Sequence, residues 1–264
     1  MLGELFMPSP PIAMTDDDFY IGYLDHAPKP LGRFLVAVVV GLVVLGGGLA
    51  IAIASGHRSL EPSTYEYLNV KSFEGVMTAE PYPSLLIARP GVTDSAATTS
   101  AYLLVREGKY GAQDLASEFS GQRVRLEGTL IYRDDQTMIE VVDGTVSAIG
   151  EGDVMRPAAV DLGEHTLHGE IVDSKCFLGV MNPGELKSHR ACASLCIRGG
   201  IPPVLVVREG EQTHYVLVQN AQGEAANEAV LDYVAEPVAL KGTLYRHGDT
   251  FALHADTDAI QRVR

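Results

Sequence analysis

The chain has 264 residues, of which 46% are hydrophobic, and its formal net charge is −14 at pH 7. This length accommodates one or two ordinary domains with hydrophobic cores. The negative charge argues against a nucleic-acid partner, because proteins bind the phosphate backbone largely through Lys and Arg. An acidic surface instead suits a basic partner, such as a small cationic electron carrier.

Residues 1–33 form an N-terminal tail in which we expect no packed domain, since it joins a Pro-rich start to an acidic run and an aromatic cluster. Phe19, Tyr20 and Tyr23 are candidate interface residues, because aromatic side chains close to a membrane can lie at the level of the headgroups. A disordered tail and a docking peptide that lies on a partner subunit are the two alternatives for this segment.

Residues 34–54 carry no charge and predict a single-pass transmembrane helix. At about 1.5 Å per residue, such a helix spans a hydrocarbon core of roughly 30 Å. A signal peptide normally has a shorter apolar region nearer the N-terminus, so we expect an anchor that is not cleaved. Lys29 and Arg33 before it, against Arg58 after it, favour a cytoplasmic N-terminus in the inner (cytoplasmic) membrane, with the C-terminal domains periplasmic.

Small residues recur along the second half of this predicted helix: Gly46, Gly48, Ala50, Ala52 and Ala54. Small side chains let another helix approach closely, which would make the chain a subunit of a larger membrane assembly. The alternative is that Gly and Ala are simply frequent in membrane helices.

Residues 55–70 form a polar linker, after which short segments of the sequence recur. Phe73–Val76 recurs as Leu167–Glu170, Val105–Gly108 as Val207–Gly210, and Leu126–Leu130 as Leu240–Leu244. The offset between the copies grows along the chain, which indicates two insertions in the second copy. The first insertion falls in the interval that contains all three cysteines.

Each copy predicts three strands, a helix and a two-strand hairpin, and alternating side chains such as those of residues 123–130 indicate half-buried strands. The expected ranges are 72–77, 85–88, 101–106, helix 112–119, 123–132 and 137–143, then 165–173, 204–208, 213–219, helix 224–234, 238–245 and 250–255.

This order of elements resembles the OB-fold, a small Greek-key barrel. The sequence therefore predicts a mainly β protein in which the transmembrane helix is followed by two tandem OB-like five-stranded barrels, at residues 71–150 and 163–264. The second barrel carries a Cys/His helical insertion at residues 176–203. Many OB-folds bind oligonucleotides or sugars, but this chain lacks the basic groove and aromatic platform for that.

The insertion holds Cys176, Cys192 and Cys196, and it is the best candidate for a functional site. A helix expected over 185–197 places His189, Cys192 and Cys196 on one face, and the preceding chain can return Cys176 to that face. Three alternatives remain open. The first is a disulfide from Cys176 to Cys192 or Cys196, which suits an oxidising compartment.

The second alternative is a Cys3His site for zinc or another thiolate-bound metal, and the third is three buried thiols that act as small hydrophobic residues. Only the second requires a cofactor. The remaining histidines of the folded region are expected at the surface or at pocket edges rather than as ligands: His165, His168, His214, His247 and His254.

Several known sites are excluded by motif. A Rieske protein has a similar layout of membrane helix and β domain, but this chain has no Cys-x-His or Cys-x-x-His pair. It also lacks the Cys-x-x-Cys-His motif of c-type haem and the common hydrolase and nucleotide-binding fingerprints.

The hypothesis that follows is a non-catalytic accessory subunit of an electron-transport (respiratory or photosynthetic) membrane complex. It would contact other membrane subunits through its helix and tail, and would stabilise the assembly or the docking of a carrier. The alternative is an extracytoplasmic metal-binding or thiol-redox protein that uses Cys176, His189, Cys192 and Cys196. A third hypothesis is an anchored binding module for a small ligand.

Overall fold

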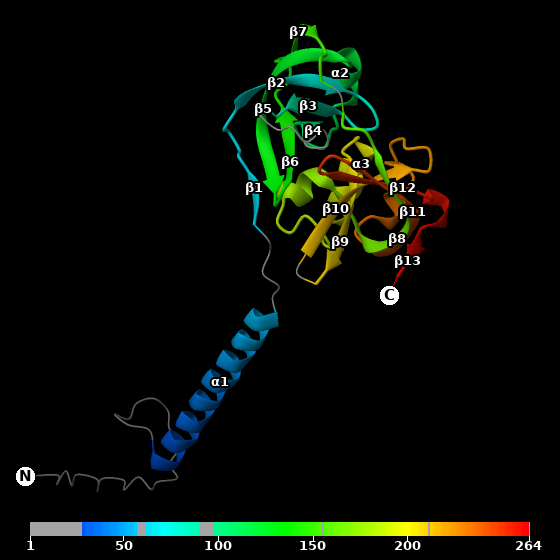
Figure 1. Ribbon diagram of the computed structural model, residues 1–264. Helices are drawn as coiled ribbons and strands as arrows, with labels where there is room; N and C mark the ends of the chain where they lie inside the picture. Colours follow the sequence, from blue (N-terminus) through cyan, green and yellow to red (C-terminus); the bar gives the residue numbers. More distant parts are fainter. Residues whose placement is uncertain (1–27, 57–61, 90–97, 155, 211, 264) are drawn as a thin grey trace, which may run out of the picture. The chain divides into compact units, whose positions relative to one another are not determined.

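The computed structural model describes residues 28–56, 62–89, 98–154, 156–210 and 212–263 (Figure 1). The chain divides into two compact units, Met1–Ser59 and Leu60–Arg264. The predicted interface residues Phe19, Tyr20 and Tyr23 lie outside the described residues.

The first unit contains one helix, α1 (Lys29–Gly56), which extends the predicted span of 34–54 at both ends. Its segment Leu31–Ser55 has a mean hydropathy of 2.8 and is long and apolar enough to cross a membrane. The small residues of the predicted packing face all lie on this helix. A Cβ added at Gly46 or Gly48 would meet no heavy atom within 4 Å, so the helix surface is open there.

The second unit begins with a seven-stranded mixed sheet. Its elements are β1 (Ser63–Tyr65), β2 (Lys71–Thr78), β3 (Ser84–Ala88), β4 (Thr99–Arg106), α2 (Gln113–Glu118), β5 (Gln122–Arg133), β6 (Gln136–Val141) and β7 (Ser147–Glu151). Five strands close into a barrel in the order β2-β3-β4-β6-β5, with β4 and β6 as the parallel pair. β1 and β7 add to β5.

A second sheet repeats this cyclic pairing. Its elements are β8 (Val160–Asp173), η1 (Cys176–Val180), α3 (Arg190–Arg198), β9 (Pro203–Glu209), β10 (Gln212–Asn220), η2 (Leu231–Tyr233), β11 (Pro237–His247), β12 (Thr250–Ala255), η3 (Thr257–Ala259) and β13 (Gln261–Arg262). The ring order is β8-β9-β10-β12-β11, again with one parallel pair, β10 and β12. The predicted mainly β fold behind an apolar helix is confirmed.

Two of the three recurring sequence segments occupy equivalent places in the two rings. Phe73 on β2 pairs with Leu126 on β5, and Leu167 on β8 pairs with Leu240 on β11. The first and fourth strands of each ring therefore meet in the same register. The repeat in the sequence reflects a repeated structure at these positions.

The glycines of these segments explain why the segments recur. A Cβ added at Gly75 of β2 would lie 2.6 Å from the carbonyl oxygen of Leu86, and one added at the equivalent Gly169 of β8 would collide with the carbonyl oxygen of Val206. The first strand of each ring thus approaches the backbone of the second strand more closely than any other residue would allow. The close approach of these two strands therefore requires glycine at this position in both rings.

The third recurrence is not a structural equivalence. Val105 and Arg106 end β4, the third strand of the first ring, whereas Val207 and Arg208 lie on β9, the second strand of the other ring. The short match aligns two strands with different neighbours. Its assignment to one repeated position was wrong.

The predicted helix over 224–234 is also wrong, because these residues form turns and the short 3-10 helix η2. The Asn220 side chain accepts hydrogen bonds from the backbone N–H groups of Gln222 and Glu224, at 3.0 and 2.9 Å. Asn227 donates its side-chain amide to the carbonyl oxygens of Ile197 and Ile201. The local bonds of Asn220 compete with helical ones, whereas those of Asn227 tie this segment to the end of α3 and the residues after it.

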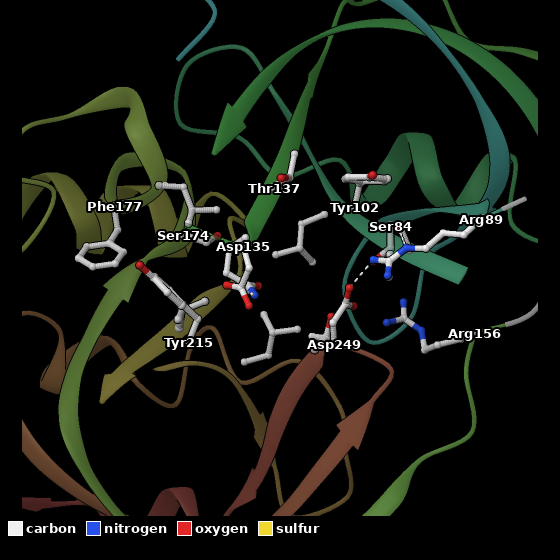
Figure 2. A pocket seen from close by; sticks show the side chains of 18 residues that line it. Ser84, Arg89, Tyr102, Asp135, Thr137, Arg156, Ser174, Phe177, Tyr215 and Asp249 are labelled. Atoms are coloured by element: carbon white, nitrogen blue, oxygen red, sulfur yellow. Dashed lines mark hydrogen bonds and ion pairs between the residues drawn. The ribbon is translucent and has the colours of Figure 1, made fainter. Parts of the chain in front are cut away.

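The two rings pack on each other through a continuous hydrophobic cluster that includes Ile131 and Met138 from the first ring and Val172 and Leu217 from the second. The buried hydroxyl of Tyr82 joins the rings directly: it donates to the carbonyl oxygen of Val218 and accepts the N–H of Ala226 at 3.0 Å. A cavity of about 110 Å³ remains between the rings (Figure 2).

Candidate functional site

Residues 174–202, between β8 and β9, form the insertion that carries the cysteines. The helix predicted over 185–197 begins five residues later in the structure, since α3 spans Arg190–Arg198. Earlier in the insertion, Cys176–Val180 forms a single π-helical turn, η1. Leu186 has a φ of 67°, which breaks a helix at that point. The side chain of Glu170 accepts the N–H of Leu186 and holds this turn in place.

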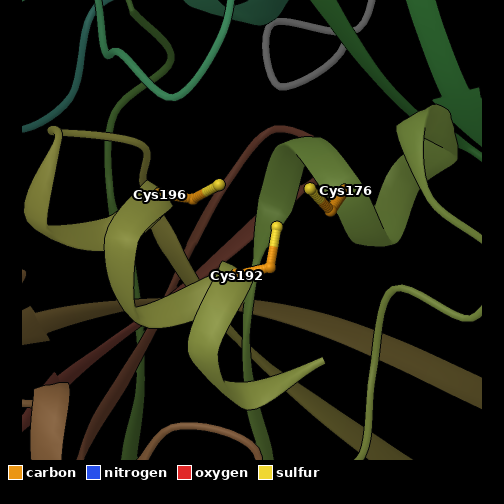
Figure 3. Close-up of side chains that lie close together, drawn as sticks. All are labelled: Cys176, Cys192 and Cys196. Atoms are coloured by element: carbon orange, nitrogen blue, oxygen red, sulfur yellow. The ribbon is translucent and has the colours of Figure 1, made fainter. Parts of the chain in front are cut away.

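The three cysteine side chains converge between η1 and α3 (Figure 3). Their Sγ atoms all lie within 4.8 Å of one another, and all three are free thiols. Cys176 and Cys196 are buried, at 4% and 1% exposure, whereas Cys192 is half-buried. The disulfides considered from the sequence are therefore not formed in this structure, and the sulfurs instead make a compact set of three.

His189 belongs to a second group. Its Nε2 lies 3.0 Å from Oδ2 of Asp173, and Asp173 Oδ1 accepts the backbone N–H of Cys176 at 2.8 Å. Ligand atoms of Asp173, Cys176 and His189 lie within 4.8 Å of one another, and all three residues are buried. The four expected residues are thus divided between two groups that share Cys176.

Lys109 completes the sulfur site from the other ring. Its Nζ lies 2.7 Å from Sγ of Cys192 and 3.6 Å from Sγ of Cys196. The hydrogen bond to Cys192 raises the pKa of Lys109, so the ammonium keeps its charge beside the sulfurs. Lys109 was not predicted from the sequence, because nothing near it in the sequence indicates that the two rings bring it to the insertion.

A close backbone contact fixes the loop that carries Lys109. The N–H of Gly111 donates to the carbonyl oxygen of Gly199 at 2.8 Å. A Cβ added at Gly199 would overlap the carbonyl oxygen of Lys109. The Gly199-Gly200 pair therefore does more than end α3, since it lets the loop of the first ring reach the end of that helix.

A buried ion pair supports the same loop. Lys175 is only 2% exposed, pairs with the carboxylate of Glu140, and donates to the carbonyl oxygens of Arg106 and Gly108 at 2.8 and 2.9 Å. Tyr65 donates its hydroxyl to the same Glu140 carboxylate. The residue just before Cys176 therefore holds the strand end and turn that present Lys109.

The thiols share their protons unequally. The hydrogen bond from Cys176 lowers the pKa of Cys196 to about 7, and the Lys109 ammonium acts in the same direction. The same hydrogen bond, together with burial, raises the pKa of Cys176. Cys196 is therefore ionised more readily than Cys176 in the metal-free site.

This arrangement suits a soft metal ion. Thiolates are the ligands that select Cu(I) and Zn(II), and three sulfurs without an imidazole in the same group leave a fourth position of a tetrahedral ion to water or another donor. The Asp173 carboxylate, bonded to both His189 and the Cys176 backbone, orients one ligand from outside the sulfur set. No family model, curated protein or solved structure matches the chain.

Proposed function

We propose that the protein is a membrane-anchored metal-binding protein that holds one thiophilic ion, Cu(I) or Zn(II), through Cys176, Cys192 and Cys196. The observation that carries this proposal is the convergence of all three sulfurs within 4.8 Å at the contact between two rings. A disulfide would use two of the three cysteines, whereas a metal ion uses all of them.

The charge of the site supports the same function. Three thiolates carry three negative charges, which a monovalent ion reduces to two and a divalent ion to one. Burying the remaining charge costs free energy unless a cation lies nearby. The Lys109 ammonium supplies that cation at 2.7 Å from Cys192. The half-buried Cys192 gives the ion a route from solvent, while the other two thiols are buried.

The setting of this site follows the sequence-based hypotheses. We infer that α1 anchors the protein in the inner membrane with both rings in the periplasm, and that both rings are OB-like. The cyclic strand order and the single parallel pair in each ring support the OB resemblance. The accessory-subunit hypothesis, with membrane partners bound through α1 and the tail, stays a prediction based on the small residues of that helix.

The direct test is metal binding by the full-length protein in detergent. The reduced protein is titrated anaerobically with Cu(I) and, separately, with Zn(II), in competition with a chelator of known affinity. We expect one ion per chain. Loss of a residue that only hydrogen-bonds to a metal ligand typically weakens binding about 10–100-fold. Each single change Cys176→Ser, Cys192→Ser and Cys196→Ser removes a ligand itself and should weaken binding by more than that.

Ser194→Ala is the matched control, because Ser194 lies on the same helix as two of the cysteines without being one of the ligands. It should bind the ion as the unchanged protein does. The proposal fails if neither ion binds, or if the cysteine variants and the Ser194 variant bind equally.

A thiol-redox function is the second candidate, and the lowered pKa of Cys196 beside Cys176 favours it. In that case mild oxidation would form one disulfide between these two cysteines with loss of two protons and two electrons to the oxidant, and would leave one free thiol at Cys192. A thiol count before and after oxidation, made on protein that binds no ion, distinguishes this function from metal binding.

A further inference from the structure

The cavity between the rings has a lining unlike that of the sulfur site. Its walls come from β3, β4 and the β5–β6 turn of the first ring, and from the insertion, β9, β10 and the β11–β12 turn of the second. None of the three cysteines lines it. Its volume of about 110 Å³ is enough for a small organic molecule or several water molecules.

The cavity has an aromatic end, beside which the carboxylate of Asp135 lies, and an end that holds two arginines (Figure 2). Phe177 and Tyr215 lie at one side, with Leu178 and Leu217 also in the lining. Two guanidinium groups, those of Arg89 and Arg156, lie close together at the other side. A ligand that fits both ends combines a short apolar body with one negatively charged group.

The two arginines differ in their partners. Arg89 forms an ion pair with Asp249 and donates to Ser100 Oγ, so its charge is compensated. Arg156 donates only to Thr78 Oγ1, at 3.3 Å, and forms no ion pair with any residue of the described ranges. Burial lowers the pKa of Arg156, because the surrounding protein solvates its charge poorly.

A second feature of the lining also lacks its partner. Ser174 is 1% exposed and lines the cavity, and its Oγ makes no hydrogen bond within the described part of the chain. Buried polar atoms are nearly always hydrogen-bonded in folded proteins, to protein, water or ligand. A hydroxyl and a charged guanidinium therefore both offer donors to the same cavity.

Arg156 also borders a second hollow, of about 360 Å³, which shares Leu217 and Thr250 with the first. His247 and His254 line this second hollow, so these histidines lie at a pocket edge, as expected from the sequence. Burial, with a smaller effect of His247, lowers the pKa of His254. Around neutral pH the imidazole of His254 therefore adds hydrogen-bonding groups rather than a charge.

We propose that this cleft between the rings binds a small organic oxyanion, a carboxylate or a phosphate, whose charged group is held by Arg156 and whose apolar part lies against Phe177 and Leu217. A guanidinium holds a carboxylate or phosphate through two parallel hydrogen bonds. Such a ligand would give Arg156 the negatively charged partner that it lacks among the described residues. This site is separate from the proposed metal site and does not depend on it.

Equilibrium dialysis of the full-length protein in detergent, at low ionic strength, tests the proposal with two labelled probes, benzoate and inorganic phosphate. At least one probe should bind saturably, and uncharged benzamide should not compete. Arg156→Met should weaken binding by about 10-fold or more, since it removes a charge-assisted pair of hydrogen bonds.

Arg246→Met is the matched control, because it removes the same charge from an exposed position of β11 that lines neither hollow. It should bind the probes as the unchanged protein does. If Arg156→Met does not fold, Arg156→Lys keeps the charge without the two-pronged geometry and should bind with intermediate affinity. The proposal is overturned if neither probe binds saturably at concentrations up to about 10 mM. It is also overturned if the Arg156 and Arg246 variants lose the same binding affinity.

Discussion

The two rings share a strand order but differ in the connection from their first strand to their second. In the first ring residues 79–83 join β2 to β3, whereas in the second ring residues 174–202 join β8 to β9 and carry every cysteine of the chain. The frame is the same, with the same glycine at the crossing of the two strands. The longer connection in the second ring forms the site of the three sulfurs.

The rings also contribute unequal parts to that site. The second ring supplies three thiols, while the first supplies a cation, Lys109, and the carboxylate that pairs with Lys175. Neither ring holds both. The two copies of the fold are therefore complementary in this site, and substitutions in each ring should separate their contributions.

The largest effect is expected from breaking the buried pair between the halves. Lys175→Met leaves the largely buried carboxylate of Glu140 with the Tyr65 hydroxyl but without its cation, and breaking a buried pair typically destabilises a protein by about 3–5 kcal/mol. Chemical denaturation would measure this loss. The double change Lys175→Met with Glu140→Leu should recover much of it, and equal stability of the single and double variants would contradict the assignment.

Gly199→Ala is expected to have the next effect. The new Cβ would overlap the carbonyl oxygen of Lys109, so the loop has to move away from α3, at a cost of about 1–3 kcal/mol. Metal affinity should fall with stability, because Lys109 moves with the loop. Gly150→Ala, where the added Cβ meets nothing within 4 Å, is the control and should change neither.

Removing the cation alone should act on the thiols rather than on folding. Lys109→Met takes away one of the effects that lower the pKa of Cys196, so the thiolate absorbance near 240 nm should appear at higher pH than in the unchanged metal-free protein. Since a metal displaces thiol protons, binding should then require higher pH as well. Lys187→Met, at an exposed position, should leave the titration unchanged.

The last effect is expected on stability alone, at the hydroxyl that joins the rings. Tyr82→Phe removes two hydrogen bonds between them, each of which typically contributes about 0.5–1.5 kcal/mol to stability, so the expected loss is about 1–3 kcal/mol. Thermal unfolding would detect the change. Tyr110→Phe, at a side chain that is 64% exposed, should leave the melting temperature where it was.

The strands of both rings could be predicted from the sequence because side-chain alternation is a local signal. β5, expected at 123–132, spans Gln122–Arg133, and β12, expected at 250–255, spans Thr250–Ala255. The short strands β1, β7 and β13 were missed, since two to five residues carry little pattern and these strands form by pairing with long neighbours.

The site was predictable only in part, because only its local spacings can be read from the sequence. Cys192 and Cys196 lie on one helix, so their proximity follows from helical spacing. Asp173, three residues before Cys176, could have been noticed as a polar residue at the end of a predicted strand. Lys109 and Arg156 could not, because their places depend on how two rings pack, and packing leaves no short-range pattern in the sequence.

The most direct test of the account is X-ray absorption at the metal edge of the full-length protein loaded with Zn(II) or Cu(I). We predict three sulfur neighbours at about 2.3 Å, the usual length of a zinc–thiolate bond, and two sulfurs after any one cysteine is changed to serine. The central claim would be contradicted if only nitrogen and oxygen atoms were bonded to the metal. It would also be contradicted if the number of bonded sulfurs stayed the same in each of the three single serine variants.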